Sequence, residues 1–473
     1  MNQTSKKEIL QYALLVIFVL LTRVPFIGHG YGIDGDSWSV AISAKNIHKT
    51  GIYEASRLPG YPIHEYLCSF FVKAGPAGLN ALTAVFSCIA VLFFALTLRI
   101  LRFKQIFLAS ITFSMVPVFY IQSTTTIDYV IALGFIMAAM YALFRNKLIL
   151  SGILVGLAIG TRITSGAMLI PFSILLIDND DMKGSIHKIM RLIVPALIAG
   201  LFFFLPVIAT YGPGFFTYYD VPYPSIAKVL YKFSIEVWGV IGFFGLIIST
   251  GLLFLPEKIT QKKFLFPRTV NEKFVIAWLV AIDLYIIAFL KLPMESGYLI
   301  PIIPFVIMLF GKYLYNRAFI FFCGMLILSA WVCTISPRER FDAVSPSHAS
   351  FSFSSAGEKL YFDVLKGPVL SYDTRRENGI DFVNKLLASL DTVQSKTVLV
   401  SGKWYNQLAV QSSDTSKENV VLVDYLLEDK AVYYYAKGYT IYYLPKQDFY
   451  NKVMRKVDLE IYKAIPYIKD DRN

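Results

Sequence analysis

Apolar runs long enough to cross a lipid bilayer alternate with short polar stretches over most of the chain. A membrane-spanning helix needs about 20 apolar residues. The first run is too long for the core of a signal peptide and lacks a small-residue cleavage site, so it is predicted to be retained. The pattern predicts about eleven transmembrane helices, at residues 9–26, 77–98, 105–121, 128–144, 148–161, 163–177, 189–209, 234–255, 274–290, 298–314 and 318–336.

Basic residues gather in every second loop between these runs. The loops near 122–127, 210–233 and 291–297 are poor in Lys and Arg. Because cytoplasmic loops carry the excess of Lys and Arg, the N-terminus is predicted to be inside. The basic residues of the inner loops are Arg99, Arg102, Lys104, Arg145, Lys147, Lys183, Lys188, Arg191, Lys258, Lys262, Lys263, Arg268, Lys273, Lys312 and Arg317.

The tail after the last apolar run is polar and has a different pattern. Short runs typical of strands occur at 397–400, 420–423 and 440–444, with tyrosine-rich stretches at 433–435 and 439–443 that also suggest strands. Segments with helical periodicity lie near 380–390 and 449–457. Since an odd number of passes places the tail outside, we expect a transmembrane module over 1–340 and an extracytoplasmic α/β domain over 341–473. A Ser- and Pro-containing linker is expected at 345–355.

The composition excludes the common soluble classes. The 473 residues are 56% hydrophobic and 16% charged, whereas soluble domains have about 25% charged residues. The 15% of aromatic residues argue against disorder. The net charge of +12 is largely explained by the basic inner loops, so no nucleic-acid partner is needed. The four cysteines have no metal-type spacing, and no nucleotide-binding fingerprint is present.

The outer loop after the first span, 28–67, carries the first candidate chemistry. Asp34 and Asp36 precede an amphipathic segment, 41–47, that suits the membrane surface and ends at Gly51. Arg57 then opens a rigid Pro- and Gly-containing turn. An acid beside a cation near the membrane suits a lipid-linked phosphate substrate, because the cation neutralises the phosphate and the acid accepts a proton. The alternatives are a solvated acidic loop and a headgroup anchor at Arg57.

Three further charged residues border apolar runs. Asp128 is either functional, since a carboxylate at the membrane is costly, or a helix N-cap. Arg162 is either a phosphate ligand or an interfacial residue whose charge reaches water. Glu295 is either functional or simply solvated. His64 and Glu65 follow the turn that contains Tyr61, and they either line the site or are simply polar residues of a loop.

Four local patterns together resemble the GT-C superfamily of polyprenyl-phosphate-sugar-dependent glycosyltransferases, which includes protein O-mannosyltransferases and aminoarabinose transferases. Two departures stand out: Ser37 replaces a second acid, and Gly297 replaces an arginine. The resemblance covers roughly residues 1–340. The patterns are DGDS at 34–37, IDY at 127–129, GLAIGTR at 156–162 followed by LIP at 169–171, and ESGYLIP at 295–301 followed by Pro304.

The resemblance implies an enzyme that moves one sugar, with inversion, from a polyprenyl-phosphate donor to a hydroxyl of a protein, lipid or glycan at the outer face. It implies Asp36 as the catalytic base, with Asp34 as the alternative, and Asp128 as a second acid of the outer face. No cofactor is expected: a divalent metal is left open, but Ser37 disfavours it. Substrate-binding residues are expected to be Arg57, Tyr61, His64, Arg162, Glu295 and Tyr298.

Two other classes of function remain open. A lipid or oligosaccharide flippase would show internal repeats and ionisable residues near the middle of the bilayer, whereas here no repeat is visible and the candidates gather on one face. A non-catalytic scaffold would place its function in the outer domain. The expected location is the cytoplasmic membrane of a prokaryote, with the C-terminal domain outside.

Overall fold

The computed structural model describes residues 6–216, 223–254, 265–266, 272–337, 350–355, 358–391, 393–412, 419–444 and 463–464. Six helical segments of this part are long and apolar enough to cross a membrane, so the chain is an integral membrane protein of mostly helical structure. They are α1 (Lys6–Arg23) with η1 (Val24–Phe26), α3 (Pro62–Phe71) with η2 (Val72–Ala74) and α4 (Gly75–Ile100), α10 (Met182–Tyr211) with η4 (Gly212–Phe216), α12 (Ile235–Leu252), α14 (Glu272–Lys291), and η5 (Ser296–Ile302) with α15 (Ile303–Tyr313).

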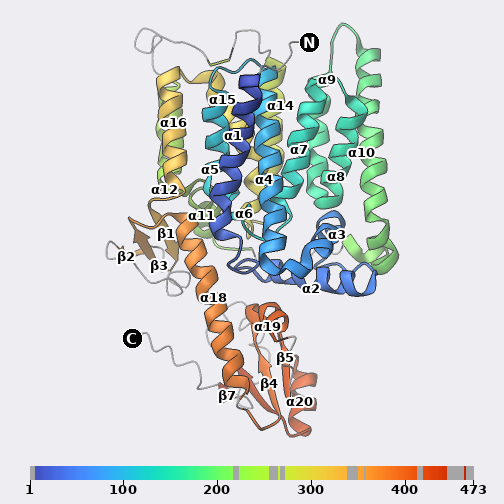
Figure 1. The fold of residues 1–473 in the computed structure, drawn as a ribbon, viewed down its shortest axis with the longest axis vertical. Coiled ribbons are helices and arrows are strands. Elements are labelled where there is room, and N and C mark those ends of the chain that lie inside the picture. The colour runs from blue at the N-terminus through green and yellow to red at the C-terminus, as the bar shows by residue number, and fades with distance from the viewer. Residues whose placement is uncertain are drawn as a thin grey trace.

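Shorter apolar helices complete the bundle (Figure 1). The predicted span 105–121 is broken, because Pro117 has no amide hydrogen to continue the helix and Val116 before it is extended, with ψ 128°. The number of passes stays a prediction. The shorter helices are α5 (Ile106–Met115), α7 (Tyr129–Phe144), α8 (Leu148–Thr161), η3 (Ile163–Met168) with α9 (Leu169–Leu176), and α16 (Asn316–Ser329); α6 (Pro117–Gln122) and α11 (Ile226–Phe233) are shorter still.

Close packing fixes α8 against α10. A Cβ atom at Gly152 would come within 2.3 Å of the Leu192 carbonyl oxygen, so only glycine permits this approach of the two backbones. Small residues at such interfaces are a common device in membrane helices. This packing matters for the site because Arg162 directly follows α8.

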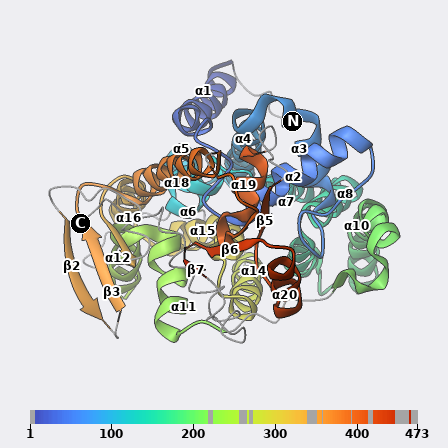
Figure 2. The same cartoon turned by 90° about the horizontal axis from the view of Figure 1, so that it is seen from below.

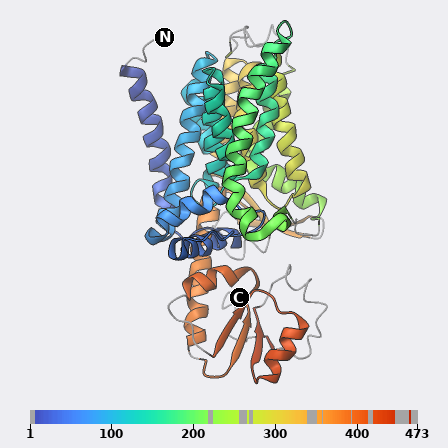
Figure 3. The ribbon, with the colours of Figure 1, turned by 90° about the vertical axis from the view of Figure 1, so that its right-hand side faces the viewer.

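Two helices form the end of the bundle that the first loop covers. The predicted amphipathic segment lies within α2 (Gly35–Thr50), which ends at Gly51 with φ 71°, as predicted. The helix α2 lies across the lower end of the bundle, with α3 beside it, while α1 stands at the edge of the bundle (Figures 1 and 3). The sequence did not reveal α3, which begins at Pro62 of the predicted turn.

The C-terminal strands form two sheets. In the first, β1 (Thr334–Pro337) and β2 (Ser350–Ser355) pair antiparallel with the central β3 (Glu358–Asp363). The predicted linker 345–355 is therefore wrong in its second half, which is β2; residues 345–349 lie outside the described residues. The second sheet is parallel in the order β5 (Val420–Val423), β4 (Thr397–Val400), β6 (Thr440–Tyr443), β7 (Lys463–Ala464).

The predicted strands at 397–400, 420–423 and 440–444 are confirmed as β4, β5 and β6, and 380–390 falls within the helix α18 (Pro368–Asp391). The predicted strand at 433–435 is wrong, because these tyrosines belong to the helix α20 (Glu428–Ala436). The helical segment 449–457 lies outside the described residues. Two short helical pieces, η6 (Gly402–Trp404) and α19 (Tyr405–Gln411), follow β4.

The helix α18 joins the parallel sheet to the bundle (Figures 1 and 2). Arg376 of α18 is buried and donates hydrogen bonds to the carbonyl oxygens of Thr124 (2.7 Å) and Phe26. It also pairs with Asp373, one turn away at 2.9 Å. These bonds hold the start of α18 against the same end of the bundle that α2 and α3 cover.

Candidate active site

A chain of ion pairs links residues of four segments. Arg57 lies between α2 and α3, Asp128 directly precedes α7, and Arg162 directly follows α8. The Oδ1 atom of Asp128 is 3.1 Å from Arg57 Nη2, and its Oδ2 atom is 2.6 Å from Arg162 Nη1. Arg57 Nε in turn lies 3.2 Å from Oδ2 of Asp36, on α2. The four residues therefore form one continuous ion-pair cluster, in the order Asp36, Arg57, Asp128, Arg162.

Burial bears on the interpretations that the sequence left open. Asp128 stands at the N-cap position of α7, but its fully buried side chain makes no N-cap hydrogen bond to that helix. Its carboxylate instead pairs with the guanidinium groups of Arg162 and Arg57, which compensate the buried charge. Arg162 is also buried, with 6% of its surface exposed, which does not fit an interfacial arginine that reaches water.

Three tyrosine rings surround the guanidinium groups. The Arg162 guanidinium carbon lies 3.7 Å from the ring centre of Tyr129 and 4.4 Å from that of Tyr298, and that of Arg57 lies 4.2 Å from the ring of Tyr61. Such contacts stabilise a desolvated cation by about 2 kcal/mol. The position of Gly297 explains the missing arginine of the motif, because a Cβ atom there would be 2.5 Å from the Tyr129 ring.

Not every buried polar atom of the cluster has a partner. Among the described residues, no hydrogen-bond acceptor faces Arg57 Nη1 or Arg162 Nε. His64, which is fully buried on α3, likewise has two ring nitrogens for which the described residues offer no partner. Because an unsatisfied buried donor costs about 1–3 kcal/mol, such atoms mark where an anionic or polar substrate would bind.

Glu65 organises the segment that carries Arg57. Its side chain is fully buried on α3, and its Oε1 atom accepts hydrogen bonds from the backbone amide and the hydroxyl of Ser56, both at 2.6 Å. Its Oε2 atom accepts from the Tyr53 hydroxyl at 2.5 Å and from the Tyr61 amide at 3.0 Å. The sequence marked Glu65 only as a loop residue near the site, whereas it fixes both ends of the segment that contains Arg57.

The remaining predicted residues lie at the margin of the cluster. Asp36 is partly exposed, with 43% of its side chain accessible, and Asp34 is exposed at the N-cap position of α2. Burial of Glu295, together with the nearby carboxylates of Asp34 and Asp36, raises its pKa to about 8. Lys232 of α11, buried and paired with Glu236 at 3.1 Å, counters this shift. In the sequence, nothing beyond an i,i+4 charge pair with Glu236 marks Lys232.

The raised pKa of Glu295 makes stability depend on pH. The folded state keeps a proton that the unfolded state releases above about pH 4.5, so the free energy of unfolding is expected to fall as the pH rises toward about 8 and to level off above it. Glu295→Gln should remove this fall, and Glu272→Gln, at the exposed start of α14, should keep it. Denaturant titrations between about pH 5 and pH 9 measure this. An unchanged slope in Glu295→Gln would contradict the assignment.

Among the described residues, one group of three side chains has the ligand types that could hold a metal ion. His29, Asp373 and Glu377 bring their ligand atoms within 4.8 Å of one another. His29 Nδ1 lies 2.9 Å from Asp373, which also pairs with Arg376. This group joins the first loop to α18 and does not include Asp36 or Asp128.

Among known proteins, the chain is similar to three solved structures. No protein-family model matches the sequence, and no curated protein matches it. The chain is similar to ArnT from Cupriavidus metallidurans. In the apo state the TM-score is 0.49 with 11% identity, over 96% of this chain and 89% of that one. For ArnT bound to undecaprenyl phosphate the TM-score is 0.49 with 12% identity, over 97% and 90%. An oligosaccharyltransferase from Archaeoglobus fulgidus, tethered to an acceptor peptide, has a TM-score of 0.39 with 11% identity, over 84% and 63%.

Proposed function

We propose that the chain is a membrane glycosyltransferase that moves one sugar from a polyprenyl-phosphate donor to an acceptor hydroxyl at the outer face of the membrane. The observation that carries the proposal is Arg57, whose guanidinium links the partly exposed Asp36 to the buried Asp128 and Arg162. In support, the partly exposed Asp36 contacts Arg57, and Arg162 follows across Asp128; each arginine has a buried donor for which the described residues offer no acceptor. Such a pair suits the displacement of a phosphate by a hydroxyl.

The proposed step is a single displacement. The acceptor oxygen forms a bond to the anomeric carbon, and the bond from that carbon to the phosphate oxygen breaks. The carrier leaves as polyprenyl phosphate with the bonding electron pair, and its charge is stabilised by Arg57 and Arg162. The hydroxyl proton passes to Asp36. Because attack and departure are in line, the configuration of the sugar inverts.

The other candidate residues take supporting roles in this proposal. Asp128 orients the two arginines, since both of its oxygens already contact guanidinium groups. Tyr61 and Tyr298 shield the arginines from water, and the ring nitrogens of His64 offer hydrogen bonds to the donor. Asp34 and Glu295 border the sugar or acceptor. The division at residue 340, the inside N-terminus and a prokaryotic membrane belong to the same proposal.

The proposed base is tested by Asp36→Asn. We expect the transfer rate to fall by about 100-fold or more, because a positioned base contributes about 10²–10⁴ to the rate. The assay uses labelled polyprenyl-phosphate sugars extracted from the source cells and measures release of free polyprenyl phosphate by the purified protein. Asp180→Asn, in the exposed loop between α9 and α10, is the matched control. Transfer by Asp36→Asn at nearly the wild-type rate would refute the role of Asp36.

A further inference from the structure

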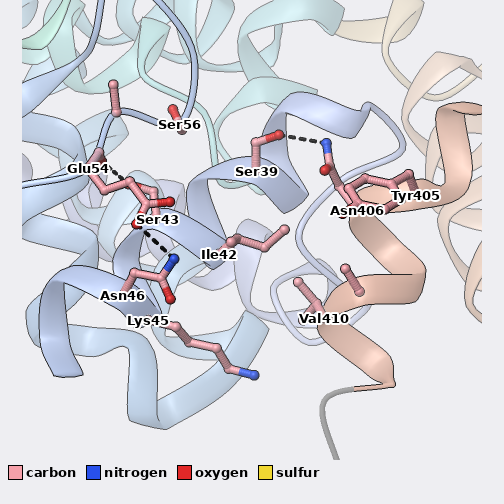
Figure 4. A pocket seen from close by; sticks show the side chains of 12 residues that line it. Ser39, Ile42, Ser43, Lys45, Asn46, Glu54, Ser56, Tyr405, Asn406 and Val410 are labelled. Carbon is pink, nitrogen blue, oxygen red and sulfur yellow. Dashed lines mark hydrogen bonds between the residues drawn. The ribbon is translucent and has the colours of Figure 1, made fainter. Parts of the chain in front are cut away.

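A cavity opens where the parallel-sheet region meets the bundle. It has a volume of about 380 Å³ and lies between α2, residues 54–56 and α19 (Figure 4). This volume is within the range of small-ligand sites, about 300–1,000 Å³. Its two walls come from segments more than 300 positions apart in the sequence, and none of the predicted site residues lines it.

Polar side chains of the cavity are held in place by one another. The Asn406 amide donates to the Ser39 hydroxyl at 2.6 Å and to the Gly35 carbonyl at 3.1 Å, which ties α19 to α2. The Asn46 amide donates to the Glu54 carboxylate at 2.9 Å. Figure 4 shows these groups from both walls around the cavity. Their positions are therefore set before a ligand binds, which lowers the cost of binding.

The same face of α2 leads from the cavity to the ion-pair cluster. Asp36, Ser39, Ser43 and Asn46 follow one another at spacings of three, four and three residues, which places them along one stripe of the helix. The cavity is also lined by Ser56, the residue before Arg57. A ligand in the cavity would thus reach along α2 toward Asp36.

The chemistry of the lining favours a sugar over the other acceptor classes. Hydroxyl and amide groups that both donate and accept, a carboxylate that accepts, and the Tyr405 ring match a ligand rich in hydroxyls. Lys45 and Glu54 supply one charge of each sign, so the cavity has no bias toward an anion.

We propose that this cavity is the acceptor subsite and that it takes a sugar residue of a glycan, whose attacking hydroxyl lies on the Asp36 side. The inference rests on the proposed function and gives it an acceptor class. It also gives α19 a role, because this helix supplies one wall of the subsite.

The test fills the cavity without removing a polar contact. Ala409→Trp places a large ring in the cavity, and Ala436→Trp, at the exposed end of α20, is the matched control. The full chain in lipid nanodiscs receives labelled polyprenyl-phosphate sugars and, separately, the polysaccharide, protein and lipid fractions of cells that lack it. Binding of the lipid phosphate of the donor is measured separately, as the rise in melting temperature that undecaprenyl phosphate produces.

We expect label to enter the polysaccharide fraction. Ala409→Trp should raise the polysaccharide concentration for half-maximal transfer about tenfold or more, with unchanged stabilisation by undecaprenyl phosphate. If Ala409→Trp does not fold, Asn46→Ala, which removes one amide of the wall, must raise that concentration. Label that enters only protein or lipid, or a half-maximal concentration equal to that of the wild type, would overturn the inference alone. A wild-type protein that labels none of the three fractions would refute the proposed function as well.

Discussion

Asp128→Asn is expected to lower the free energy of unfolding by about 3–5 kcal/mol, the cost of removing one partner from a buried ion-pair network. The carboxylate contacts both Arg57 and Arg162 and is fully buried. With asparagine in its place, two guanidinium groups would face each other without an anion between them. The same change should disorder the site and abolish transfer.

The measurement is a denaturant titration of the purified protein in detergent. Asp180→Asn is the matched control, because its side chain is exposed, and surface changes of this kind shift stability by about 0.5 kcal/mol or less. An Asp128→Asn protein as stable as the control would show that water or lipid, and not Asp128, compensates the two arginines.

Glu65→Ala is expected to lower the free energy of unfolding by about 3 kcal/mol or more, because each buried donor left without an acceptor costs about 1–3 kcal/mol. Four hydrogen bonds from Tyr53, Ser56 and Tyr61 converge on this carboxylate. Their loss should release the segment that holds Arg57, so the transfer rate should fall together with stability.

Glu65→Gln separates shape from charge. The amide oxygen can still accept from Ser56, but the amide nitrogen would face the Tyr61 N–H, where two donors meet. We therefore expect about half of the loss seen with alanine, and partial recovery of transfer. Unfolding titrations and transfer assays on both variants measure this, with Glu272→Gln as the control. Equal losses for alanine and glutamine would mean that the charge alone matters.

The sequence predicted the helices well where apolar runs were long and uninterrupted, as in α4, α7 and α10. It missed α3, because the polar pair His64 and Glu65 near the start of this helix was taken for part of a loop. It misassigned 433–435, since tyrosine favours strands in general, whereas here the three tyrosines lie in α20.

The site was predicted residue by residue but not as an arrangement. Asp128 was selected because a carboxylate beside an apolar run is costly, whereas Arg57 and Arg162 were selected as cations suited to a lipid-linked phosphate. Their mutual contacts join positions 71 and 34 residues apart, and no local pattern reports such distances. The four bonds of Glu65 and the burial of Lys232 depend on the packed structure in the same way.

Gly297 couples two positions of the site. A larger side chain at position 297 would displace the Tyr129 ring from its place over Arg162. A larger residue at 297 would therefore require a smaller residue at 129, and Arg162 would then lose this aromatic cover.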